Sequence, residues 1–160
     1  MVQFRNILFL VDMSESSSKI VPYVKILAEL FEPDIHLLYV APSVDCLPDV
    51  MIEQSTLNSF ESEILNRAKV SLKQFKEKHF GNSTCFKMVV KRGYPSEEIL
   101  KYVSKEKVDL IIMGTHGRKS LENAIFGSVA EQVVKTSSVP VLTINPHKIK
   151  AEEDKALFYN

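Results

Sequence analysis

Five short apolar runs recur along the chain, each of strand length and rich in Val, Ile, Leu and Phe. The runs Ile7–Val11, Ile35–Val40 and Leu110–Met113 are almost continuously apolar, which is typical of strands that are buried on both faces of a parallel sheet. The run Phe86–Val90 alternates more with polar residues, and Val139–Ile144 carries a proline near its start. We therefore expect these two runs at the edges of the sheet.

Four segments with helical periodicity separate the runs. Their apolar residues recur every three or four positions, and serines, a proline or a glycine stand at their starts as capping or first-turn residues. On this spacing Phe60 belongs to the apolar stripe of the second segment, and Val129, Val133 and Val134 to the inward face of the fourth. The segments are Ile20 to Phe31 after Ser14–Ser18, Leu57 to Phe75, Ser96 to Val103 after Pro95, and Gly127 to Lys135.

The strict alternation of strands and helices predicts an α/β fold: a single doubly wound, five-stranded parallel sheet with helices on both faces. Right-handed crossovers leave few arrangements, and we favour the strand order 3-2-1-4-5. Strands one and four are then neighbours whose connections leave in opposite directions, so a ligand crevice opens at their carboxyl ends. We expect one domain over residues 1–146 and a polar C-terminal tail over residues 147–160.

The amino-acid composition limits the kinds of partner that the chain is expected to bind. The chain has 160 residues, of which 45% are hydrophobic, and its 20 Lys and Arg residues balance 20 Asp and Glu residues. A formal charge of zero argues against a nucleic-acid partner, and no segment approaches the roughly 18 apolar residues of a membrane span. Cys46 and Cys85 are far apart in the sequence and are interpreted as free thiols. We expect a cytoplasmic protein with no nucleic-acid or membrane partner.

The stretch GTHGRKSLENAIFGS, from Gly114 to Ser128, lies at the predicted crevice. Gly114 ends the fourth strand, and Gly127 with Ser128 begins the last helix, whose unpaired N–H groups and partial positive charge can bind an anion. Arg118 adds a mobile positive charge directly after Gly117. The stretch is neither a Walker A loop nor a Rossmann fingerprint, so generic motifs alone favour a phosphate site and a plain connecting loop about equally.

The spacing of these glycines resembles a family signature. Gly114-x-x-Gly117, nine further residues and then Gly127-Ser128 are similar to the pattern G-2x-G-9x-G-[S/T] of the universal stress protein family. The resemblance extends over about residues 3–145, and in that family the signature marks members that bind ATP. It therefore implies a nucleotide-responsive, regulatory stress-response protein. Further matching stretches are Asn6–Ser14, Leu37–Val40 and Gly93–Leu100.

Carried over position by position, the resemblance implies a set of nucleotide contacts. Asp12 would lie over the adenosine, Val40 would offer backbone groups to adenine, and Met113 would line the base pocket. Leu10 and Tyr39 stand where the family often has a proline and a histidine. The implied ligand is ATP, without distinction from ADP or AMP, with Mg²⁺ carried mainly by the phosphates. The predicted nucleotide-binding residues are Leu10, Val11, Asp12, Val40, Met113, Gly114, Gly117, Arg118, Gly127, Ser128 and Val129.

Several residues have a plainer interpretation. Asp12 can instead cap the first helix or satisfy N–H groups at the end of the first strand. His116 is as well explained as a solvated loop histidine as by a phosphate contact. No catalytic residues can be assigned, so we expect binding with slow hydrolysis or none. An active ATPase remains an alternative, as does a dimeric interaction module in which nucleotide is incidental. The resemblance implies a homodimer formed by antiparallel pairing of Val139–Ile144.

Overall fold

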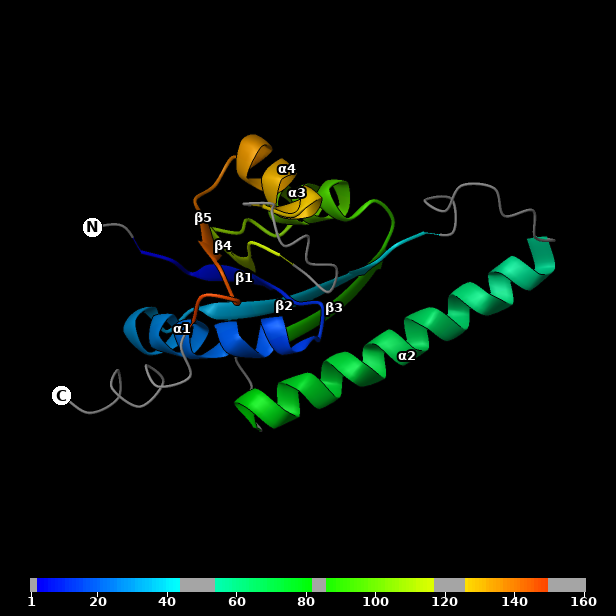
Figure 1. Ribbon diagram of the computed structural model, residues 1–160, viewed down its shortest axis with the longest axis horizontal. Coiled ribbons are helices and arrows are strands. Elements are labelled where there is room, and N and C mark those ends of the chain that lie inside the picture. Colours follow the sequence, from blue (N-terminus) through cyan, green and yellow to red (C-terminus); the bar gives the residue numbers. More distant parts are fainter. Residues whose placement is uncertain (1–2, 44–53, 82–85, 117–125, 150–160) are drawn as a thin grey trace.

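The computed structural model describes residues 3–43, 54–81, 86–116 and 126–149. Within these ranges strands and helices alternate strictly along the chain, as predicted (Figure 1). The elements are β1 (Asn6–Leu10), α1 (Glu15–Phe31), β2 (Asp34–Ala41), α2 (Gln54–Phe80), β3 (Phe86–Arg92), α3 (Pro95–Lys105), β4 (Leu110–Gly114), α4 (Ser128–Thr136) and β5 (Val141–Ile144).

The strands form one all-parallel sheet in the order β3-β2-β1-β4-β5, which confirms the predicted topology. β1 lies at the centre, where Phe9 is in register with Leu37 of β2 and Ile112 of β4. β3 and β5 are the edge strands, as expected. β5 begins two residues later than the predicted strand because Pro140 has no N–H to donate, although its carbonyl oxygen still accepts from the Ile111 N–H at 3.0 Å.

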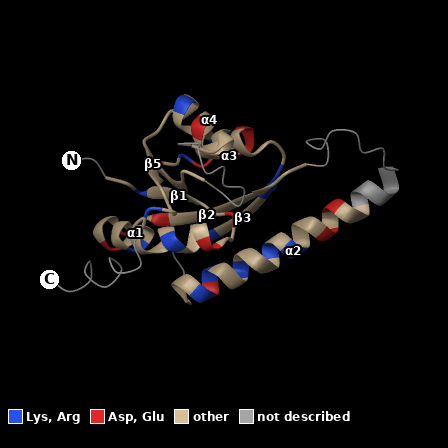
Figure 2. Cartoon of the chain, viewed as in Figure 1, with Lys and Arg blue, Asp and Glu red and all other residues tan. Residues whose placement is uncertain are grey.

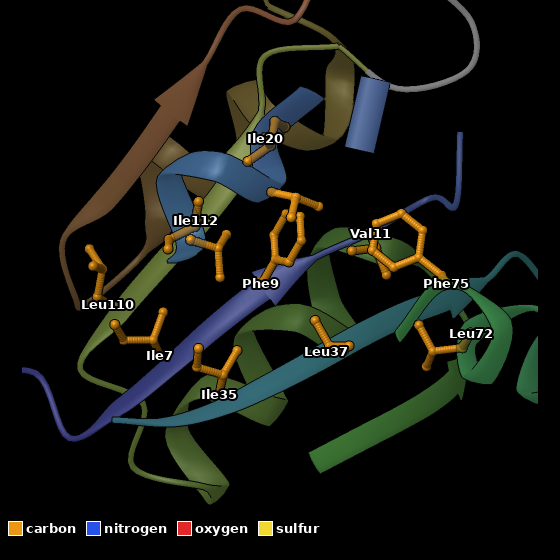
Figure 3. Packing of buried hydrophobic residues seen from close by; sticks show 12 residues of the cluster. Ile7, Phe9, Val11, Ile20, Ile35, Leu37, Leu72, Phe75, Leu110 and Ile112 are labelled. Carbon is orange, nitrogen blue, oxygen red and sulfur yellow. The ribbon is translucent and has the colours of Figure 1, made fainter. Parts of the chain in front are cut away.

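Helices cover both faces of the sheet: α1 and α2 pack on one side, and α3 and α4 on the other (Figure 1). Successive residues of β1 alternate between two cores. Phe9 points to the α1 and α2 side, where Figure 3 shows it near Phe75, with ring centroids 6.4 Å apart. Leu8 belongs to the core on the α3 and α4 side. Both residues are completely buried, which explains why the strand sequence lacks polar alternation.

Two predicted inward positions were wrong. Phe60 is 52% exposed, because the N-terminal part of α2 extends beyond the sheet (Figure 1), whereas Leu72 near the other end is buried. Val134 on α4 is 44% exposed, although Val133 beside it is completely buried. Neighbouring helical residues point about 100° apart, so a helix with only one side on the sheet buries one of such a pair.

Charged side chains are distributed over the helices, with both signs interspersed, while the strands are mostly uncharged (Figure 2). Several of these charges pair within one helix, for example Arg67 with Glu63 and Lys135 with Glu131. Such exposed pairs contribute about 0–1 kcal/mol each. None of the described helices combines the length and the apolar character needed to cross a lipid bilayer.

Candidate functional site

A cavity of about 430 Å³ lies at the carboxyl ends of β1 and β4, at the switch point that the topology predicts. This volume is within the range of small-molecule sites, about 300–1,000 Å³. Gly117 and Arg118 lie outside the described residues. All the other predicted site residues line the cavity, namely Leu10, Val11, Asp12, Val40, Met113, Gly114, Gly127, Ser128 and Val129.

Asp12 organises the turn between β1 and α1. Its Oδ1 accepts hydrogen bonds from the Ser14 N–H at 3.0 Å, the Ser14 hydroxyl at 2.5 Å and the Ser17 hydroxyl at 2.7 Å. Its own N–H donates to Ser17 Oγ at 3.0 Å. These bonds hold the turn even though Met13 has a φ of 59°, which a residue with a Cβ adopts only at a cost. Asp12 therefore has a structural role in the turn that precedes α1, and it also borders the cavity.

The two glycines of the cavity wall differ in what surrounds them. A Cβ added at Gly114 would lie 3.0 Å from the carbonyl oxygen of His116 and 3.2 Å from Cδ1 of Ile20. At Gly127 the nearest atom would be the carbonyl oxygen of Thr115 at 3.5 Å, an ordinary contact. Packing of the chain itself therefore favours glycine at position 114, where a Cβ would fit only if its neighbours moved by a few tenths of an ångström, but not at position 127.

The residues just after β4 are held between two neighbouring elements. The Thr115 N–H donates to the Ile144 carbonyl oxygen of β5 at 2.9 Å, and the Thr115 carbonyl oxygen accepts from the Gly127 N–H at 2.7 Å. His116 follows, with Nδ1 3.0 Å from Thr115 Oγ1 and its ring centroid 5.9 Å from that of His147. His116 is only 7% exposed and lines the cavity, so its interpretation as a solvated loop histidine was wrong.

Several lining residues were missed by sequence reasoning. Ser17 is buried at the cavity, although the serine run around it gives only a capping signal. Pro42, Pro95 and Ile99 form an apolar wall on the β2 side of the site. Pro42 directly follows β2, so its loop was expected at the crevice, whereas Pro95 and Ile99 come from α3, which reaches the cavity only through the crossover that follows β3. The cavity is thus lined by apolar residues from β2 and α3 and by polar residues from the β1–α1 turn, the end of β4 and the start of α4.

A buried histidine with a shifted pKa lies on β2, a strand that contributes residues to the cavity. His36 of β2 is buried, and its Nδ1 is 2.9 Å from the hydroxyl of Tyr102, on the same helix that supplies Ile99 to the cavity. Burial lowers the pKa of His36, and the nearby Lys87 lowers it further. In the described part of the chain, no three His, Cys, Asp or Glu residues gather closely enough to bind a metal ion.

The model of the universal stress protein family matches residues 3–145, and so spans every strand and helix of this fold. The chain belongs to that family. It is 31% identical over 155 residues to the universal stress protein MJ0577 of Methanocaldococcus jannaschii, a match that covers 89% of this chain and 96% of the relative.

Solved structures of universal stress proteins have the same architecture. The structure of MJ0577 superposes with a TM-score of 0.77 at 30% identity, covering 90% of this chain and 97% of that one. UspA of Lactobacillus plantarum gives a TM-score of 0.75 at 21% identity over 91% of this chain and all of the other. The structure of a universal stress protein in complex with cAMP gives a TM-score of 0.58 at 18% identity, covering 91% of this chain and 99% of that one. These likenesses place the cavity within a fold common to the family.

Proposed function

We propose that this universal stress protein binds an adenine nucleotide, with ATP as the expected ligand, and acts as a nucleotide-responsive regulator of the stress response. The observation that carries the proposal is the cavity at the topological switch point, where the N-terminus of α4 meets an apolar wall. A nucleotide has the same two parts, since its phosphates suit a helix N-terminus and its base suits apolar surface. The complex of a universal stress protein with cAMP supports the choice of an adenine nucleotide, because it is a protein of this fold.

The geometry suggests how the ligand would lie. Val40 and Met113 would contact the base from β2 and β4, and the first-turn N–H groups of α4, at Ser128 and Val129, would face the phosphates. The Gly127 N–H already donates to Thr115, so the contribution of that glycine would be space for close approach. Mg²⁺ would be carried mainly by the phosphates.

We further propose that hydrolysis is slow or absent. Asp12 is the one carboxylate among the described lining residues, and its Oδ1 already accepts three hydrogen bonds from Ser14 and Ser17. These hydrogen bonds engage the carboxylate in the turn between β1 and α1, which favours a structural role over that of a base that orients an attacking water. Phosphoryl transfer also needs cationic groups that neutralise charge in the transition state, and no Lys or Arg is among the described residues that line the cavity.

Calorimetry on purified protein, stripped of nucleotide, tests the proposal. We expect saturable binding of ATP in the presence of Mg²⁺ and weaker binding of GTP, which serves as the control for the base. Mass spectrometry of any nucleotide that copurifies would distinguish ATP from ADP and AMP. If neither ATP, ADP nor AMP binds, the proposed function is wrong, and steady turnover that follows the concentration of the protein would contradict the statement on hydrolysis.

We also propose that two copies pair through β5. This strand is an edge of the sheet, Leu142 on it is 38% exposed, and Val134 on the neighbouring α4 is 44% exposed. An apolar strand edge invites pairing with another strand. Sedimentation should show a dimer at micromolar concentration that Leu142→Lys dissociates, while Leu30→Lys, at a residue of α1 that is 69% exposed, leaves it intact. A monomeric wild-type protein would contradict the pairing.

A further inference from the structure

His36 is a buried, titratable residue that does not line the cavity but holds together two of the elements that do. It lies on β2, and its Nδ1 is 2.9 Å from the hydroxyl of Tyr102 on α3. The two rings pack edge to face with centroids 5.7 Å apart, and both side chains are buried. Because buried side chains are closely packed, this contact sets the separation of α3 from β2.

The same interface between β2 and α3 continues to the cavity. Leu38 is two residues after His36, and so lies on the same face of the strand, while Ile99 lies about one turn before Tyr102 on the helix. Leu38, Ile99 and Tyr102 belong to one buried cluster, and Leu38 and Ile99 line the cavity. A change in the separation of β2 and α3 at His36 would therefore reach the cavity wall.

The groups that surround His36 disfavour its protonation on balance. Lys87 of β3 is in register with it on the neighbouring strand, and Lys87 Nζ lies 2.6 Å from Oε2 of Glu106, which directly follows α3. Burial, as the largest cause, and then Lys87 lower the pKa of His36, and the opposing effects of Glu106 and Asp34 are smaller. Leu8, in register with His36 on β1, is apolar. The ring is therefore neutral in the folded protein at pH 7 and above.

Protonation would weaken the contact between His36 and Tyr102 in two ways. It would place a second cation beside Lys87 in a buried setting, where repulsion is poorly screened. Both ring nitrogens would also become donors, so the Tyr102 hydroxyl could only accept from Nδ1 and would have to direct its own proton elsewhere. Since an imidazolium is better solvated by water, both effects favour an arrangement in which His36 is more exposed and α3 lies farther from β2.

We propose that His36 is a proton sensor of the nucleotide site: when it is protonated, α3 moves away from β2, the cavity wall at Ile99 loosens, and nucleotide is released. This inference rests on the proposed function. Nucleotide that needs the wall in place binds the neutral form more tightly, and by reciprocity its binding favours loss of the proton from His36. A coupling of this kind corresponds to a change in affinity of about fivefold or more.

The test measures ATP binding by calorimetry, with Mg²⁺ present, in steps from about pH 7.5 to about pH 5.5. Titration of ATP itself is common to all proteins and cancels in the ratio of variant to wild type. We expect acidification to weaken ATP binding about fivefold more for the wild type than for His36→Gln. Lys87→Gln removes the nearby cation and leaves Glu106 to stabilise the imidazolium, so its affinity should fall at a higher pH than that of the wild type. Lys101→Gln, which removes an exposed charge of the same α3, is the matched control and should follow the wild type.

NMR follows the proton directly. Titration of the imidazole signals, with that of His36 identified by its absence in His36→Gln, gives the pKa with and without ATP, and we expect the lower value in the ATP-bound protein. Equal pKa values in the two states would overturn the sensor while the proposed function stands.

The variants provide the remaining controls. Thermal unfolding checks that each one is folded, and Lys87→Gln, at a side chain that is 53% exposed, carries the test alone if His36→Gln is not. ATP binding whose dependence on pH is the same in the wild type and in the folded variants at positions 36 and 87 would also overturn the sensor. A wild-type protein that does not bind ATP even at pH 7.5 would overturn both the sensor and the proposed function.

Discussion

Replacement of Gly114 by alanine tests why the first glycine of the motif is present. The new methyl group would lie 3.0 Å from a backbone oxygen of His116 and 3.2 Å from the Ile20 side chain. The backbone oxygen has little freedom to move, because the preceding residue, Thr115, is hydrogen-bonded to β5 on one side and to Gly127 on the other. We therefore expect overpacking and not relaxation.

The magnitude follows from two opposing effects. Overpacking in a well-packed region costs about 1–3 kcal/mol, while replacing glycine by alanine recovers about 0.4–1 kcal/mol by restricting the unfolded chain. The free energy of unfolding should fall by about 1–2 kcal/mol. For a chain of 160 residues that lowers Tm by roughly 2–8 °C.

Gly127→Ala is the matched control for Gly114→Ala. A Cβ there would have only ordinary contacts, and its φ of −71° suits alanine, so we expect a change in stability within about 1 kcal/mol. If the proposed function is right, this variant instead weakens ATP binding, since the methyl group would occupy space next to the phosphates. Scanning calorimetry and titration with ATP measure the two effects separately. Equal Tm values for the two variants, or a lower Tm for Gly127→Ala, would refute the reasoning.

Three further predictions concern stability. Burial lowers the pKa of His36 from its ordinary value of 6.5, so the unfolded chain binds a proton at this residue more tightly than the folded chain does. The stability that neutral His36 contributes is therefore complete above about pH 6.5, and it is lost as the pH falls from there through the lowered pKa of the folded state. The urea midpoint should therefore fall more steeply on acidification for the wild type than for His36→Gln, and parallel curves would contradict this. Ser17→Ala removes two hydrogen bonds to Asp12 and should lower the free energy of unfolding by about 1–3 kcal/mol, measured by urea titration, whereas no loss would show that the turn holds without them. Val133→Ala should lower the free energy of unfolding by about 1–3 kcal/mol and Val134→Ala by less than about 0.5 kcal/mol, because only Val133 is buried. Equal losses of stability in thermal unfolding would contradict the orientation of α4.

Much of the fold could be predicted because its signals are local. The continuous apolar runs of β1, β2 and β4 require burial on both faces, and the alternation of strands with helices then leaves few topologies. Edge positions were also predictable, since the proline before Val141 and the polar residues of β3 are unsuited to a central strand. Phe60 was misplaced because periodicity gives the direction of a side chain but not how far the sheet extends beneath its helix.

The sequence by itself determined the order of elements and the position of the crevice, since each follows from strand ends and helix starts, and together with the family resemblance it identified nine of the residues at the cavity wall. Tertiary structure alone decided the surroundings of those residues. It buried His116 between Thr115 and His147, brought Pro95 and Ile99 to the cavity from α3, and gave Gly114 a packing role that Gly127 does not share. The physical reason is that burial and steric contact depend on segments distant in sequence, whereas capping, periodicity and turn chemistry depend on neighbours a few residues away.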